Sequence, residues 1–173
     1  MSIGDAEIKT QERVIRFFKD PEILGYQYIG NLSDYQNKNI KEDRLRQYLR
    51  LKGYADKLID AAVMQLQQEA GNLFRGVYDA NKTVYSRLKY GIPVSESPEK
   101  PPVTVELIDE ANPLNNDFAI AEEVTVVEQQ EKRPDLVIYL NGIAVAVIEL
   151  KRSSITVSEG IRQNLTNQKD SFI

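Results

Sequence analysis

Three charged residues flank the most apolar stretch of this sequence. Asp135 precedes residues 136–148, and Glu149 and Lys151 follow them. On a strand, Glu149 and Lys151 point to the same face because they are two residues apart. Such charges at the end of a buried strand are costly unless they are paired or bind a ligand. Two carboxylates and an ammonium suit metal-assisted phosphodiester hydrolysis, in which the cation polarises the phosphate and activates water, and the lysine orients that water or stabilises charge.

The residue types in the chain limit the kind of metal. The 173 residues include no Cys and no His, which excludes thiolate zinc sites, cysteine nucleophiles and histidine general bases. A bound metal would need oxygen ligands, which favours Mg²⁺, Mn²⁺ or Ca²⁺. The alternative for Glu149 and Lys151 is a solvated ion pair at the margin of a sheet.

The stretch that carries these residues is predicted to be a β-hairpin. Residues 135–151 form two β-rich runs around Asn141-Gly142, which is a strong signal for a tight turn. Both faces of the hairpin are apolar. We therefore predict a central pair of strands that is covered on both sides.

The register of this hairpin decides whether the two carboxylates can meet. A two-residue loop followed by regular pairing would place Asp135 opposite Ile148, and so on the other face from Glu149. A shared metal site therefore predicts one of three features. These are a three-residue loop over 140–142 with Gly142 left-handed in a bulge, a bulge elsewhere in the pair, or Asp135 lying just before regular pairing begins.

The spacing of apolar residues in the rest of the sequence predicts an α/β fold, in which a small mixed sheet has helices on both sides. Helices are predicted over 5–19, 40–52, 54–70 and 80–90, with a last one from Ser158, and strands over 24–30, 103–108 and 118–129. Asn39 and Glu42 resemble a capping box, and Asp79 is a candidate helix cap. The segment SESPEKPP at 95–102 is predicted to be irregular.

The charge of the chain argues against binding of nucleic acid over its whole surface. There are 22 basic and 26 acidic residues, for a net charge of -4. A local basic stretch over 41–52, with Tyr48 and Tyr54 interleaved, could face DNA phosphates, but an ordinary solvated helix face is favoured. The apolar runs Leu136–Leu140 and Ile143–Ile148 are too short to span a bilayer. The start lacks a signal-peptide pattern, so a cytoplasmic location is expected.

The stretch RPDLVIYLNGIAVAVIELKR at 133–152 resembles the PD-(D/E)xK nuclease superfamily, with thirteen residues between Asp135 and Glu149. The amino-acid sequence of this stretch is similar to that of the N-terminal nuclease domain of the R subunit of type I restriction-modification enzymes. The resemblance implies a PD-(D/E)xK restriction-endonuclease-like core, a mixed sheet flanked by helices. It implies a single nuclease domain over 1–173, with a core at 5–30 and 103–173 and a helical insertion at about 39–91, cut from a longer protein.

The resemblance also implies roles for individual residues. Asp135 and Glu149 would be the ligands of Mg²⁺ or Mn²⁺, and Lys151 would be the catalytic base, the water-orienting group or the charge stabiliser. Families of this kind often carry a further Glu in the first helix, where Glu12 is the first candidate and Glu7 the second. A solvated helix residue is the alternative for Glu12.

A second motif of this family, Gln-x-x-x-Tyr, lies in the helix after the hairpin and is thought to meet DNA. Gln163 matches its glutamine, but Asn167 stands where the tyrosine is expected, and Gln168 with Phe172 offers a shifted match. Gln163 is therefore a candidate DNA-contacting or site-organising residue. The alternative is the polar face of an amphipathic helix.

The function implied by the resemblance is that of a type I site-specific deoxyribonuclease. The domain would cut unmodified foreign double-stranded DNA together with modification and specificity subunits. No P-loop motif is present, so ATP would be used only in a translocase part that lies C-terminal to this sequence. Two alternatives stay open, a helicase-linked nuclease of another repair or defence system and a non-catalytic assembly module that keeps the fold.

Overall fold

The computed structural model describes residues 3–33, 39–72, 74, 76–97, 99–127, 131–150 and 161–162. The chain divides into two compact units. The first unit comprises Met1–Asn39, Phe118–Tyr139 and Ala144–Ile173, and the second comprises Ile40–Asp117 and Leu140–Ile143. The family resemblance implied an insertion that ends near residue 91, whereas the second unit continues to Asp117.

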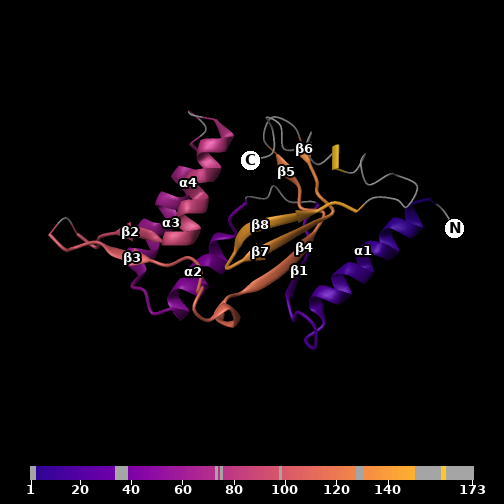
Figure 1. Cartoon of the computed structure of the whole chain (residues 1–173), viewed down its shortest axis with the longest axis horizontal. Coiled ribbons are helices and arrows are strands. Elements are labelled where there is room, and N and C mark those ends of the chain that lie inside the picture. Colours follow the sequence, from indigo (N-terminus) through magenta and orange to yellow (C-terminus); the bar gives the residue numbers. More distant parts are fainter. Residues whose placement is uncertain are drawn as a thin grey trace. The chain divides into compact units, whose positions relative to one another are not determined.

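The first unit is built on a four-stranded mixed sheet in the order β1-β4-β7-β8 (Figure 1). Its elements are α1 (Ile3–Lys19), β1 (Gln27–Asn31), β4 (Phe118–Glu122), β7 (Leu136–Leu140) and β8 (Ile143–Ile148). A two-stranded antiparallel sheet, β5 (Val126–Val127) with β6 (Glu131–Lys132), lies between β4 and β7 in sequence. Strands β1 and β4 are parallel, with an irregularity between Tyr28 and Asn31.

Helix α1 covers one face of this sheet. Ile15 of α1 packs against Ile120 of β4 and Leu136 of β7, and the helix lies beside β1 in Figure 1. The opposite face buries Ala119 and Tyr139, because successive residues of a strand point to opposite sides. Burial raises the pKa of Tyr139 to about 12. Strand β4 is thus buried on both faces.

The prediction of a hairpin covered on both sides is wrong for its second strand. Strand β7 is internal, but β8 forms the edge of the described sheet, and Val145 and Val147 are 45% and 48% exposed. Valine and isoleucine, which supply four of the six residues of β8, are enriched in strands. Their presence therefore did not distinguish a half-exposed edge strand from a buried central one.

The hairpin turn has two residues, so the three-residue loop is not formed. Asn141 and Gly142 both have positive φ, 51° and 81°, as a two-residue turn of the I′ kind requires. Strand β7 begins at Leu136, so Asp135 lies just before the strand. This is the third of the three arrangements compatible with a shared metal site.

The second unit packs three helices against a small antiparallel sheet. The helices are α2 (Glu42–Leu51), α3 (Asp56–Ala70) and α4 (Val77–Tyr90), the strands are β2 (Ile92–Val94) and β3 (Val103–Val105), and a 3₁₀ turn spans Pro113–Asn115. Helices α3 and α4 lie side by side (Figure 1). Their core includes Leu49, Ile59, Leu66, Ile92 and Val105. Strand β2 was not predicted from the sequence, whereas the described part of 95–102 contains neither helix nor strand, as expected.

The hairpin turn, residues Leu140–Ile143, is grouped with this second unit. Asn141 is fully buried, where its Oδ1 accepts a hydrogen bond from the Asp117 amide at 2.7 Å and its Nδ2 donates to the Leu107 carbonyl at 2.8 Å. The Lys41 amide donates to the Gly142 carbonyl at 2.7 Å. Backbone groups at the start of α2 thus lie directly against the turn.

The predicted helix caps are wrong at two positions. Helix α2 begins after Lys41 with no side-chain cap, and Glu42 accepts hydrogen bonds from Arg46 and Gln67 instead of closing a capping box. Helix α4 begins after Gly76, which places Asp79 inside its first turn. Both predictions assigned the cap from residue type alone, and the true boundaries lie two or three residues away.

Candidate functional site

Asp135 is fixed at the open end of the β7–β8 hairpin. Its half-buried carboxylate accepts a hydrogen bond from the Leu150 amide, with 2.5 Å between Oδ2 and N. Its carbonyl accepts a second bond, from the Glu123 amide at 3.0 Å. The Leu150 nitrogen belongs to the peptide bond that joins Glu149 to Leu150, so the carboxylate of Asp135 lies directly beside Glu149.

Glu149 follows the end of β8 at Ile148 and is partly buried. The residues on either side of it, Ile148 and Leu150, pack against the cluster of Ile15, Ile120 and Leu136. This packing holds the chain in place at Glu149. The structure therefore brings two predicted metal ligands, Asp135 and Glu149, to the same end of the hairpin.

Lys151, Gln163 and Asn167 lie outside the described residues, as do Gln168 and Phe172. Glu12 is exposed, whereas its neighbour Gln11 reaches the sheet and donates a hydrogen bond to Glu122 at 2.9 Å. The side chain of Glu7 lies outside the described part. Glu12, Asp135 and Glu149 do not form a three-residue acidic cluster that could hold a metal within the described part of the chain.

Two acidic residues at the end of β4 were missed by sequence reasoning. Glu123 has a left-handed backbone, with φ 52°, and its carboxylate pairs with Arg133 at 2.9 Å. The same residue donates its amide to Asp135, so it holds both ends of the Arg-Pro-Asp segment. A left-handed glutamate carries no sequence signal because glutamate, unlike glycine or asparagine, has no intrinsic tendency towards this conformation and adopts it where the surrounding structure imposes it.

Glu122 has a different role. It accepts hydrogen bonds from the Tyr28 hydroxyl at 2.6 Å and from Gln11 at 2.9 Å. Burial, with a contribution from this carboxylate, raises the pKa of Tyr28 to about 12. Through these two hydrogen bonds, Glu122 ties β1 and α1 to the end of β4.

The donor chemistry at the hairpin fits a hard divalent cation. Asp135 and Glu149 supply carboxylate oxygens, which are the ligands that Mg²⁺ and Mn²⁺ prefer. Within the described part of the chain, no three acidic residues cluster closely enough to form a complete metal site. A cation here would therefore be held by two carboxylates, with water or other groups completing its shell.

The basic stretch over 41–52 forms ion pairs within the second unit. The pairs are Arg44 with Asp117, Arg46 with Glu42 and Asp60, Arg50 with Asp56, and Lys52 with Asp109. Tyr48, interleaved with these residues, is buried. These contacts favour the alternative of an ordinary helix face over a surface that presents its charges to DNA.

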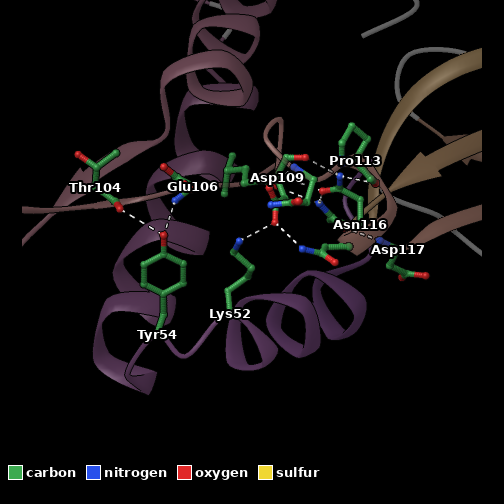
Figure 2. A network of polar contacts seen from close by, with 12 residues as sticks. Lys52, Tyr54, Thr104, Glu106, Asp109, Pro113, Asn116 and Asp117 are labelled. Atoms are coloured by element: carbon green, nitrogen blue, oxygen red, sulfur yellow. Dashed lines mark hydrogen bonds and ion pairs between the residues drawn. The ribbon is translucent and has the colours of Figure 1, made fainter.

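The pair of Lys52 and Asp109 belongs to a larger polar network (Figure 2). Asp109 accepts hydrogen bonds from Lys52 at 2.8 Å, from the Asn115 side chain at 3.0 Å and from the Asn112 amide at 2.9 Å. These bonds, led by that of Lys52, lower the pKa of Asp109 from 3.8 to about 2. The Tyr54 hydroxyl joins Thr104 and Glu106 of the same unit. We assign the network a structural role, since its donors and acceptors satisfy one another.

None of the helices in the described residues is long and apolar enough to cross a membrane. This agrees with the short apolar runs of the sequence.

Comparison with known proteins identifies the family. The family model described as "Type I restriction enzyme R protein N terminus" matches residues 7–172. A protein of Methanocaldococcus jannaschii, named "Putative type I restriction enzyme MjaIXP endonuclease subunit", is 34% identical over 97 residues. These residues are 51% of this chain and 9% of that protein. Because the family model covers nearly the whole chain, this chain belongs to the family of type I restriction enzyme R protein N termini.

Proposed function

We propose that this chain is the metal-dependent DNA endonuclease domain of a type I restriction enzyme R subunit. The observation that supports the proposal is the hydrogen bond from the Leu150 amide to Asp135, because this amide belongs to the peptide bond that follows Glu149. The sequence positions of both residues and of Lys151 match the PD-(D/E)xK pattern. A fold of that superfamily, double-stranded DNA as substrate and modification and specificity subunits as partners are parts of the same proposal.

The proposed chemistry assigns a role to each of these residues. Asp135 and Glu149 would hold Mg²⁺ or Mn²⁺, which when bound supplies polarisation of the scissile phosphate and an activated water. The Asp135 carboxylate is held by the Leu150 amide through one oxygen, which leaves the other oxygen available as a ligand. Lys151, two residues after Glu149, would orient the water or stabilise charge on the phosphate. Gln163 would contact DNA, and ATP would be used only by a translocase outside this chain.

Calorimetric titration of Mn²⁺ into the chain tests the metal site. The informative variants are Asp135→Asn and Glu149→Gln, because an amide oxygen in Asn still accepts the Leu150 hydrogen bond while the ligand charge is removed. Glu99→Gln, at an exposed carboxylate of the second unit, is the matched control. We expect saturable binding in the wild type and the control, and its loss in both site variants.

Equal Mn²⁺ binding by all four proteins would refute the proposed ligands. The catalytic role is tested separately in the full-length R subunit assembled with its partners, by cleavage of unmodified DNA. Asp135→Asn, Glu149→Gln and Lys151→Ala should each abolish cutting while the fold survives. Unchanged cutting would favour the alternative of a non-catalytic assembly module.

A further inference from the structure

Helix α4 presents a regular stripe of aromatic and basic residues. One side of the helix, with Ala80, Val84 and Leu88, packs in the core of the second unit or against it. The opposite side carries Tyr78, Lys82, Tyr85 and Lys89, which are spaced i, i+4, i+7 and i+11 and so share one face. We call these four residues the Tyr-Lys stripe. At 1.5 Å per residue the stripe is about 16 Å long.

The tyrosines of the stripe contribute little to the fold. Tyr78 is 77% exposed and Tyr85 is 64% exposed, so their rings lie on the surface of the unit. Scattered exposed apolar residues need no explanation, whereas exposed rings that share one face with other potential ligand-binding groups mark a candidate binding surface. The rings therefore need an explanation other than packing of the core.

The lysines of the stripe differ from the basic residues of α2. Neither Lys82 nor Lys89 forms an ion pair with any described residue, whereas four of the cations near α2 are paired with carboxylates. The Lys89 ammonium lies 5.2 Å from the centre of the Tyr90 ring. A hydrogen bond to Tyr90, with smaller contributions from Tyr85 and Glu110, raises the pKa of Lys89. Both cations are therefore available to an anionic ligand.

The acidic residue of α4, Asp79, lies about a quarter of a turn away from the stripe at 100° per residue. The stripe itself therefore combines two cations and two aromatic rings with no carboxylate. The cores of protein-protein interfaces are depleted in lysine. Positive charge with interleaved aromatic rings is instead the combination that single-stranded nucleic acids bind, through phosphates and stacked bases.

We propose that the Tyr-Lys stripe of α4 binds single-stranded DNA, with phosphates against Lys82 and Lys89 and unpaired bases stacked on Tyr78 and Tyr85. This inference rests on the proposed function, which makes DNA the substrate. It adds a binding surface made of residues of the second unit, whereas Asp135 and Glu149 belong to the first. Single-stranded DNA fits better than duplex because base faces are available for stacking only when they are unpaired.

Fluorescence anisotropy with a labelled thymidine 20-mer tests the proposal, at low salt and in the presence of EDTA. Tyr78→Ser/Tyr85→Ser should weaken binding by about fivefold or more for each ring removed, and Tyr78→Phe/Tyr85→Phe should restore it because the rings are kept. Lys82→Gln/Lys89→Gln should reduce the salt dependence of binding. The slope of the logarithm of the association constant against the logarithm of the salt concentration should become less negative by about 1.4. A duplex of the same length should bind more weakly than the single strand.

Control variants are Leu114→Ser and Lys57→Gln, which remove an exposed apolar side chain and an exposed cation of the same unit. Circular dichroism should show that all variants keep their helices. The proposal is overturned if the Tyr78→Ser/Tyr85→Ser variant binds the 20-mer as the wild type does. It is equally overturned if that variant loses only assembly with partner subunits, which would make the stripe a protein interface.

The test also separates this proposal from the endonuclease proposal. Binding is measured without metal, so it does not depend on cutting. Tyr78→Ser/Tyr85→Ser should bind Mn²⁺ as the wild type does and yet bind the 20-mer more weakly. If the wild type binds no Mn²⁺ but binds the 20-mer through the stripe, the endonuclease site alone is refuted.

Discussion

Replacing Gly142 with alanine is expected to destabilise the chain. The loss should be larger than for the same replacement at another glycine that has a similar positive φ. Gly142 has φ 81°, and an added Cβ would lie 2.5 Å from the Lys41 carbonyl oxygen and 2.8 Å from the Leu45 nitrogen. Both neighbours are backbone atoms at the start of α2, so no side chain can rotate away. Either the turn or the first turn of the helix must move.

The size of the effect follows from two contributions. A left-handed backbone costs alanine about 1–2 kcal/mol, and the stiffer unfolded chain of alanine offsets about 0.4–1 kcal/mol of this. The overlap with backbone adds about 1–3 kcal/mol, as for an overpacked core. We expect Gly142→Ala to lower the free energy of unfolding by about 2–4 kcal/mol in total.

Gly53 provides a matched control within the same unit. Its φ is 86°, and nothing lies within 4 Å of the position that a Cβ would take. Gly53→Ala should therefore lose only about 1 kcal/mol, from the backbone conformation. Urea unfolding followed by circular dichroism measures both variants, and an unchanged m-value shows that they unfold as the wild type does. Equal losses in the two variants would refute the close approach between the turn and α2.

Two further predictions concern charged residues. Glu123→Gly should be about 0.5–1 kcal/mol more stable than Glu123→Ala in urea unfolding, because both lose the pair with Arg133 but only glycine relieves the left-handed backbone. Equal stability would argue against strain at Glu123. The pKa of Asp109 is lowered to about 2 in the folded chain, so its contribution to stability is complete above about pH 4 and is lost as the pH falls towards 2. Asp109→Asn should flatten the stability curve in that window, and a curve parallel to that of the wild type would contradict the role of Lys52.

Much of the local structure was predictable from the sequence. The four helices of the described part were expected from apolar residues at helical spacing, and Gly91 ends α4 as predicted, with φ 73°. The Asn141-Gly142 turn was located correctly because a tight turn of this kind depends on residues that tolerate positive φ. Each of these predictions rests on interactions between residues that are near one another in the chain.

Positions that depend on distant residues were predicted less well. The valines of β8 suited either a buried or an edge strand, and only the order of the sheet shows that β8 lies at its edge. The basic residues of α2 suited either DNA or internal partners, and Asp117 and Asp109 lie more than fifty residues away from the cations they pair with.

The candidate site shows the same division. The sequence by itself determined the candidate motif, since the types and spacing of Asp135, Glu149 and Lys151 resemble the PD-(D/E)xK pattern. Only the tertiary structure decided that Asp135 lies before β7 and that its carboxylate meets the Leu150 amide. It also decided that Glu123 is left-handed beside it. The physical reason is that a motif records residue types, whereas register, edge position and backbone strain result from the packing of segments that are far apart in sequence.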